Sequence, residues 1–292
     1  MSTETGSGDG RDVLQVLPLG GDRYSVVNVG DPAERDVVFG GQVLAQSIVV
    51  AALRHPGKKV RTIQTVFARA ARVSAALELS AETGHSGRSF ASETVTALQD
   101  GRLCVRSLVL LDIDDSDVIR HSRAMPEVAG PEDSPPFGLV EKVFPGSELR
   151  VVGGIDTGDP DLATDAAELH LWTRTRGVPD DEVSNQAVLA YATNGFLVRT
   201  ALLPHAGLGG NLVHTELSTS VLSHMITFHE PAHMDEWVLL ANASPYAGRG
   251  RSYGEVDVFS RDGRLLATAV QQNMIRSFDG AKPSEEHART LM

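Results

Sequence analysis

Two glycines stand immediately before the longest apolar run of the sequence, in Phe39-Gly40-Gly41-Gln42. If residues 42–53 form a helix, these glycines lie at its amino end, where uncovered backbone N–H groups carry the positive end of the helix dipole. Such groups can hold a carbonyl oxygen that gains negative charge during acyl transfer. Small residues here would also let the helix start pack tightly against a sheet, and the two interpretations are compatible. Gly40, Gly41 and Gln42 are therefore candidate substrate-binding residues.

Other reactive side chains give weaker signals. No pair of histidines in the second half lies at i, i+4 on a convincing helix with a third ligand nearby, so we predict no catalytic metal. The single Cys104 excludes an intramolecular disulfide and fits a reducing cytoplasm. It lies in an alternating apolar segment, which favours a packed residue over a nucleophile. The histidines concerned are His205, His214, His224, His229 and His233.

Charge and missing motifs exclude several classes of protein. A formal net charge of −12 opposes a broad contact with nucleic acid. The sequence has no phosphate-binding G-x-x-x-x-G-K-[ST], no G-x-G-x-x-G, no G-x-S-x-G and no H-E-x-x-H. Residues 1–12 do not resemble a secretory signal, and no apolar run approaches the roughly 20 residues that cross a membrane. We therefore expect a cytoplasmic protein without a membrane span.

An internal repeat reveals the elements that must position these residues. Gly87-Arg88-Ser89-Phe90 precedes Asp100-Gly101-Arg102-Leu103, and Gly250-Arg251-Ser252-Tyr253 precedes Asp262-Gly263-Arg264-Leu265. Each Asp-Gly pair lies between β-type runs, which is the strongest short hairpin signal. Each copy therefore contains strand, tight turn and strand.

An apolar stretch lies upstream of each hairpin: residues 42–53 in the first copy and residues 186–203 in the second. A helix that is apolar nearly all round is buried. We therefore predict an α+β double hot-dog fold, in which each unit wraps an antiparallel sheet around a long buried helix and the units pair at their edge strands. The predicted boundaries are 13–113 and 166–278 for the units, 114–165 for the linker, and 1–12 and 279–292 for disordered tails.

The ordered set of motifs resembles the type II acyl-CoA thioesterases, which have a double hot-dog fold. The resemblance covers about residues 37–276 outside the linker. It implies hydrolysis of fatty acyl-CoA to fatty acid and CoA, with no cofactor beyond the coenzyme A of the substrate and no metal. The motifs are Phe39-Gly40-Gly41-Gln42-Val43-Leu44-Ala45-Gln46, Gly87-Arg88-Ser89-Phe90, Gln99-Asp100-Gly101, Leu189-Ala190-Tyr191-Ala192, Phe228-His229-x-Pro231, Asp235-Glu236-Trp237, Arg249-Gly250-Arg251 and Val270-Gln271.

The resemblance also implies a catalytic set, and this sequence departs from it. The family holds and activates water with an Asp, a Ser or Thr, and a Gln. The Asp falls on Asn194, the hydroxyl residue falls on Val221, and only the Gln is kept, as Gln271. Ser223-His224 stands where the family has Asp-His. A carboxamide can orient water but cannot accept its proton.

Three alternatives remain open from the sequence. A hydrolase could use Thr219 or Ser223 as the hydroxyl and His224 as the base, since histidine titrates near neutral pH. The protein could instead bind acyl-CoA or an acyl carrier without hydrolysis, or act as a hot-dog hydratase or dehydratase. We expect a homo-oligomer. Candidate arginines for the CoA phosphates are Arg69, Arg88 and Arg251.

Overall fold

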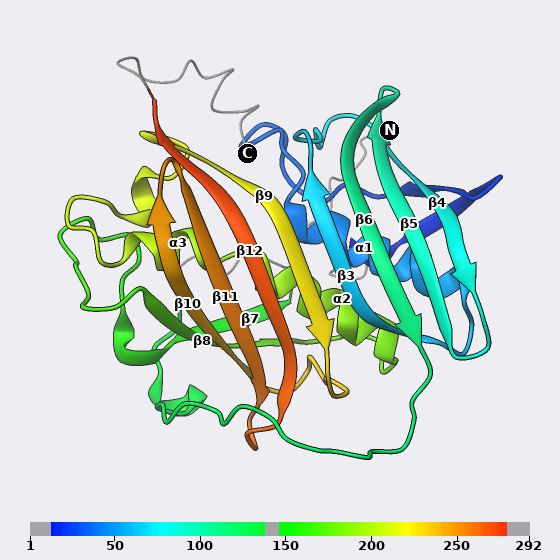
Figure 1. The fold of residues 1–292 in the computed structure, drawn as a ribbon. Coiled ribbons are helices and arrows are strands. Elements are labelled where there is room, and N and C mark those ends of the chain that lie inside the picture. Colours follow the sequence, from blue (N-terminus) through cyan, green and yellow to red (C-terminus); the bar gives the residue numbers. More distant parts are fainter. Residues whose placement is uncertain (1–12, 138–145, 279–292) are drawn as a thin grey trace.

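The computed structural model describes residues 13–137 and 146–278, which form one long antiparallel sheet with helices on one face (Figure 1). Within these residues the sheet has 12 strands in the order β1-β2-β4-β5-β6-β3-β9-β12-β11-β10-β8-β7. The first six strands in this order come from the N-terminal unit and the last six from the C-terminal unit. The repeat in the sequence is therefore a repeat in space.

The elements of the N-terminal unit follow the predicted pattern of strands around one helix. They are β1 (Val16–Gly20), β2 (Arg23–Val26), α1 (Gly40–Arg54), β3 (Lys59–Phe67), β4 (Leu77–Ser86), β5 (Phe90–Gln99) and β6 (Arg102–Asp112). The C-terminal unit contains β7 (Ser147–Val151), β8 (Glu168–Thr175), α2 (Glu182–Thr193), α3 (Leu197–Leu202), β9 (Leu217–Phe228), β10 (Val238–Gly248), β11 (Arg251–Ser260) and β12 (Leu265–Ser277).

The two units join edge to edge through β3 and β9. Residues 62–66 of β3 pair with residues 223–227 of β9 in antiparallel register. Each strand would otherwise leave a row of backbone donors and acceptors open to solvent. The pairing removes that edge, as the sequence predicts for two adjacent hot-dog units.

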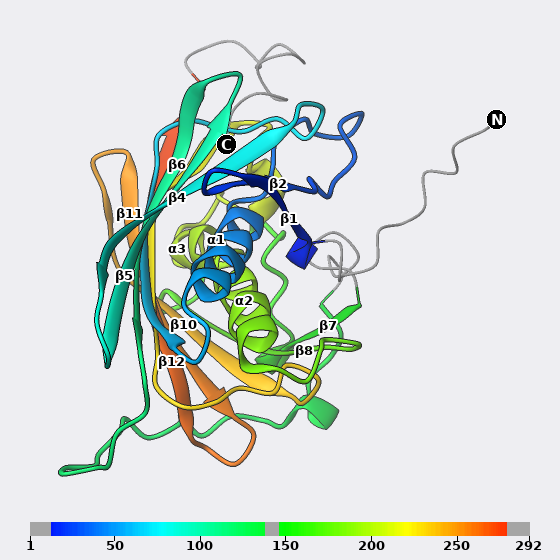
Figure 2. The same cartoon turned by 90° about the vertical axis from the view of Figure 1, so that its right-hand side faces the viewer.

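The helices lie side by side on the inner face of the curved sheet (Figure 2). Leu44 and Ile48 of α1 and Leu189 of α2 are fully buried. At its carboxyl end α1 is anchored to β5, because Arg54 Nε lies 3.0 Å from Glu93 Oε2 and His55 Nε2 lies 2.6 Å from Glu93 Oε1. The central helices are thus held in a fixed position against the sheet, and the predicted double hot-dog fold is confirmed.

Both predicted hairpins are also present. Asp100 and Gly101 connect β5 to β6 with positive φ angles of 52° and 71°. Positive φ at both central positions is the geometry of a type I′ turn, and glycine adopts it without steric cost. The loop from β11 to β12 likewise contains a glycine of positive φ, Gly263 at 88°.

Two expectations differ from the structure. The apolar stretch 186–203 is not one helix, because α2 ends at Thr193 and α3 begins at Leu197, with Asn194 as the C-cap of α2. The predicted linker 114–165 contains β7, which pairs with β8 at the end of the sheet. The tails predicted at 1–12 and 279–292 lie outside the described residues.

Candidate active site

The amino end of α1 meets the carboxyl end of α2, and two glycines make this approach possible. A Cβ atom on Gly41 would lie 2.7 Å from the Tyr191 carbonyl oxygen, and a Cβ on Gly40 would lie 2.9 Å from Asn194 Oδ1. Both separations are shorter than side-chain carbons tolerate. The glycines therefore bring the positive end of one helix dipole onto the negative end of the other.

Asn194 occupies this junction. Its side chain is 3% exposed, and its Nδ2 donates to Gln271 Oε1 at 3.1 Å. Its Oδ1 is buried and has no hydrogen-bond partner among the described residues. A buried carbonyl oxygen without a partner costs free energy on the order of 1–3 kcal/mol. This oxygen, facing the amino end of α1, is therefore a ready acceptor for a water molecule or a substrate.

His224 lies beside Gln271, because β9 and β12 pair at these two residues. The distance from His224 Nδ1 to Gln271 Oε1 is 2.9 Å, and Nε2 lies 3.2 Å from Thr193 Oγ1. An amide oxygen only accepts, so Nδ1 carries the proton. Complete burial lowers the pKa of His224 to about 4, although its bond to Gln271 acts in the opposite direction. The imidazole is thus neutral at physiological pH.

The hydrogen bonds continue along β12 to β11. Gln271 Nε2 donates to Asn273 Oδ1 at 2.6 Å, and Asn273 Nδ2 donates to Ser252 Oγ at 3.2 Å. We call the connected residues the polar cluster; all are at most 3% exposed and contribute only amides, hydroxyls and one imidazole. Its members are Thr193, Asn194, His224, Ser252, Gln271 and Asn273.

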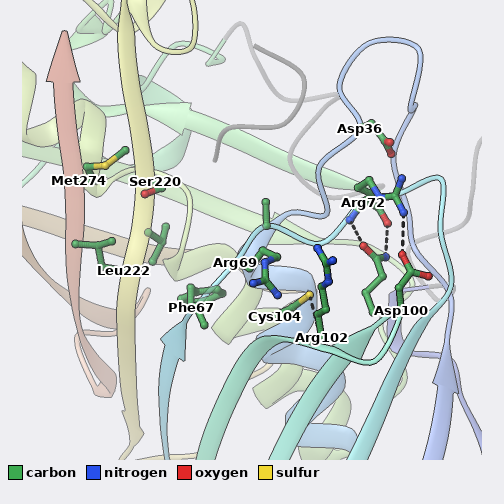
Figure 3. Close-up of a pocket in the computed structure, with 14 residues that line it drawn as sticks. Asp36, Phe67, Arg69, Arg72, Asp100, Arg102, Cys104, Ser220, Leu222 and Met274 are labelled. Carbon is green, nitrogen blue, oxygen red and sulfur yellow. Dashed lines mark hydrogen bonds and ion pairs between the residues drawn. The ribbon is translucent and has the colours of Figure 1, made fainter. Parts of the chain in front are cut away.

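A cavity of about 520 Å³ opens where β3 and β9 diverge. No member of the polar cluster lines it, but Val221, which pairs with Asn273, does. Residues 220–222 of β9 and Met274 line one side, and residues 67–70 line the other. Figure 3 shows Arg69, Arg72 and Arg102 gathered at the β3 side, across from Leu222 and Met274. The cavity volume lies in the range of roughly 300–1,000 Å³ that small-molecule sites occupy.

Phe67 links the cavity to the polar cluster. Its side chain lines the cavity, and its ring lies 3.1 Å from the position that a Gly40 Cβ would take. That same position is 2.9 Å from Asn194 Oδ1. A group entering along the cavity wall would therefore reach the amino end of α1 by passing Phe67.

A local irregularity sets which residues of β9 line the cavity. Gln272 pairs with Ser223 and Asn273 pairs with Val221, so Leu222 is the extra residue of a β-bulge. The bulge places three consecutive residues, Ser220, Val221 and Leu222, on the cavity wall. Val221, which stands where the resemblance expects a hydroxyl residue, thus presents an apolar side chain there.

Two predicted hydroxyl residues are not brought to the polar cluster. Ser223 precedes His224 and pairs with Val66, which is 55% exposed, so its side chain points to the outer face of the sheet. Thr219 is buried but lies five residues from His224, which is about 16 Å along a strand. The hydroxyl that contacts His224 is instead that of Thr193.

The predicted binding residues also separate. Gln42 uses its side chain to hold the segment that follows β2, with Nε2 2.9 Å from the Val27 carbonyl oxygen and Oε1 3.0 Å from the Val29 N–H. Arg69 lines the cavity. Arg88 is exposed just before the start of β5, at the end of that strand away from Arg102. Arg251 is exposed and precedes Ser252 of the polar cluster. Neither Arg88 nor Arg251 lines the cavity.

The sequence reasoning missed four residues that the fold brings to this region: Thr193, Asn273, Arg72 and Arg102. Thr193 was adjacent to a candidate, and Asn273 lies two residues from Gln271, on the same face of a strand. This spacing of two residues along a strand was the signal that could have identified Asn273. Arg102 marked the hairpin turn but was not connected to the site.

Two features are absent from the described ranges 13–137 and 146–278. These ranges contain no group of three or more His, Cys, Asp or Glu side chains that could hold a metal ion. None of their helices is long and apolar enough to cross a membrane.

Comparisons with known proteins agree with the fold. Acyl-CoA thioesterase 2 of Haemophilus influenzae is 28% identical over 255 residues, which is 82% of this chain and 87% of that protein. Acyl-coenzyme A thioesterase 8 of Homo sapiens is 27% identical, covering 90% of this chain and 88% of that protein. The crystal structure of an acyl-CoA thioesterase II from Mycobacterium marinum has a TM-score of 0.78 and 26% identity, covering 93% of this chain and 100% of that one.

A more distant likeness bears on the fold alone. The dehydratase domain from the CurJ module of curacin polyketide synthase has a TM-score of 0.54 at 12% identity.

Residues 30–111 match the acyl-CoA thioesterase N-terminal domain family, and residues 122–275 match the acyl-CoA thioesterase C-terminal domain family. Together these matches cover both units of the repeat and most of the segment between them. The chain therefore belongs to the acyl-CoA thioesterase family with a double hot-dog fold.

Proposed function

We propose that this protein hydrolyses acyl-CoA thioesters to a carboxylic acid and CoA. The observation that carries the proposal is the buried Asn194 Oδ1, which faces the glycine start of α1 beside a cavity of about 520 Å³. The names of the relatives support the same substrate class. The proposal applies to one site: the C-terminal unit supplies the polar cluster, and the N-terminal unit supplies α1 and most of the cavity lining.

The CoA moiety would occupy the cavity, with its phosphates at the arginines. Arg72 pairs with Asp100 at 2.9 Å, while Arg69 and Arg102 have no ion pair among the described residues. Unpaired guanidinium groups suit phosphate, which they bind with two parallel hydrogen bonds. The thioester carbonyl would then pass Phe67 and receive hydrogen bonds at the Gly40-Gly41 end of α1.

Water would be held by Asn194 Oδ1 and attack the thioester carbon. Asn194 cannot take the proton of this water, and the only titratable member of the polar cluster is His224. We assign the proton to His224 Nε2, which lies 3.2 Å from Thr193 Oγ1. The Thr193 hydroxyl also donates to the Ala190 carbonyl oxygen at 3.0 Å, so it relays the proton by turning its hydrogen from Ala190 to His224. As the tetrahedral intermediate collapses, the C–S bond breaks and CoA leaves as a thiolate, which needs no general acid because thiols ionise near pH 8.5.

Thiol release from a panel of acyl-CoAs by the purified protein tests this proposal. Release that depends on enzyme concentration, with the free acid identified by mass spectrometry, is the expected result. Calorimetric binding without release would leave a non-hydrolytic acyl-CoA or acyl-carrier binding protein. A 3-hydroxyacyl product from an enoyl-CoA would indicate a hydratase, for which no side chain of the polar cluster provides an Asp-His pair.

Two further expectations accompany this function and need their own measurements. We infer a homo-oligomer, which light scattering coupled to gel filtration would test. We also infer a cytoplasmic location and no cofactor beyond the CoA of the substrate. Full activity after dialysis against a chelator is the expected result for the latter.

A further inference from the structure

Asn273 lies two residues after Gln271 on β12, with its side chain on the same face of the sheet. It is 0% exposed on β12 and pairs in register with Ser252 of β11, which is 2% exposed. The Asn273 side chain connects Gln271 to Ser252, because Oδ1 accepts a hydrogen bond from Gln271 Nε2 and Nδ2 donates one to Ser252 Oγ. Neither Asn273 nor Gln271 lines the cavity, and the Asn273 side chain reaches Asn194 and His224 only through its hydrogen bond with Gln271.

The direction of each hydrogen bond in this row is determined by its neighbour. Since Gln271 Nε2 donates to Asn273, Gln271 Oε1 faces the helices and accepts from both Asn194 Nδ2 and His224 Nδ1. Asn194 Nδ2 is thereby committed to Gln271, so Asn194 Oδ1 faces Gly40. Three amides thus point the same way.

An isolated flip of Gln271 is unfavourable. It would place Gln271 Oε1 against Asn273 Oδ1 at 2.6 Å, and it would set the Gln271 amino group against the N–H groups of its other partners. The whole row could reverse, because the Ser252 hydroxyl can donate as well as accept. Reversal would turn the Asn194 amino group toward the amino end of α1, where donors and positive dipole oppose it.

We propose that Asn273 is a positioning residue that fixes the amide of Gln271, so that Asn194 presents its carbonyl oxygen, and not its amino group, to the reacting water. The expected effect on kcat rests on the proposed hydrolysis, whereas the orientation of the amides and the tautomer of His224 do not. The row also fixes the His224 tautomer with hydrogen on Nδ1, which leaves Nε2 as the proton acceptor facing Thr193.

Two substitutions separate this role from simple packing. Asn273→Leu has nearly the same shape but removes the acceptor for Gln271 Nε2. Asn273→Asp retains an oxygen acceptor at that place, so it keeps the direction of the row. We expect Asn273→Leu to lower kcat by about 10- to 100-fold with KM changed less than about threefold, and Asn273→Asp to retain most activity.

The tautomer of His224, read from long-range imidazole ¹H–¹⁵N spectra, is the readout that does not need turnover. The spectrum of His224→Gln identifies the signal among the 10 histidines. The expected result is hydrogen on Nδ1 in the wild type and in Asn273→Asp, with a tautomer mixture in Asn273→Leu. Circular dichroism checks that each variant is folded.

Two results would overturn the inference. Hydrogen on Nε2 in the wild type would mean that the row runs in the opposite direction, and this needs no variant to fold. Equal kinetic loss in Asn273→Leu and Asn273→Asp, with an unchanged tautomer, would reduce Asn273 to a packing residue. Absence of thiol release from every acyl-CoA by the wild type would reject the proposed function while the tautomer measurement still decides the orientation.

Discussion

Asn194→Asp should increase hydrolysis, because it introduces the carboxylate that the polar cluster lacks. A general base contributes roughly 10²- to 10⁴-fold to a proton-transfer step. Here the gain is reduced, because a carboxylate cannot donate to Gln271 Oε1 as Asn194 Nδ2 does at 3.1 Å. The amides of Gln271 and Asn273 must reverse to accommodate it. We therefore expect an increase in kcat of about 10- to 100-fold, which is about 1.4–2.7 kcal/mol of activation free energy.

Stability should move in the opposite direction to activity. Burying a carboxylate without a paired cation costs about 3–5 kcal/mol, and the amino end of α1 returns about 0.3–1 kcal/mol. The net loss in the free energy of unfolding is then about 2–5 kcal/mol, measured by urea denaturation. The rate should rise with pH through the pKa of the new carboxyl, because only its ionised form accepts a proton.

The double substitution Asn194→Asp with Asn273→Asp is the matched control. An acceptor fixed at position 273 prevents Gln271 from reversing, so the double variant should lose most of the gain. Thiol release is followed continuously with a chromogenic thiol reagent over a range of pH. If folded Asn194→Asp binds acyl-CoA normally but hydrolyses it no faster than the wild type, then Asn194 does not face the reacting water and the reasoning is wrong.

Three further perturbations address other parts of the site. The free energy of unfolding should fall by about 3 kcal/mol as pH decreases from about 6.5 to about 4, because His224 is held neutral in the fold but becomes protonated in the unfolded chain. This pH-dependent loss should be smaller in His224→Gln. An identical pH dependence in both proteins would contradict the lowered pKa of His224. Gly41→Ala should lower the free energy of unfolding by about 1–3 kcal/mol and lower kcat, because the added methyl would lie 2.6 Å from the Phe39 ring. Gly195→Ala is the matched control, since its methyl would have its nearest contact at 3.9 Å. Arg102→Ala should raise KM for acyl-CoA by about 3- to 10-fold, which corresponds to a partly solvated charge contact of about 0.7–1.4 kcal/mol. Arg88→Ala should leave KM unchanged, and equal effects of the two substitutions would exclude the cavity as the CoA site.

Local sequence was sufficient for the elements and for the glycine junction. The Asp-Gly turns, the apolar run of α1 and the spacing of the repeat are determined by preferences that act over a few residues. Gly40 and Gly41 were found for the same reason, because they are adjacent to that run. The family resemblance then identified Asn194, Gln271 and His224, which the fold brings into direct hydrogen-bond contact.

The composition of the polar cluster depended on tertiary structure. Ser223 and His224 are neighbours in sequence, yet alternation along β9 sends them to opposite faces of the sheet. The bulge at Leu222 changes that alternation beyond this point, and nothing in the local pattern marks it. Arg88 and Arg102 flank β5, so a strand of 10 residues, about 30 Å long, separates them and only one reaches the cavity.

The sequence by itself thus determined the internal repeat, the buried helix α1, the two hairpins and the glycines at the helix junction. Only the tertiary structure decided the partners within the site. Asn273 and Thr193 enter it from β12 and from the end of α2, across about 80 residues of chain. Hydrogen-bond direction depends on which side chains face one another across strands, and that information exists only after the sheet has formed.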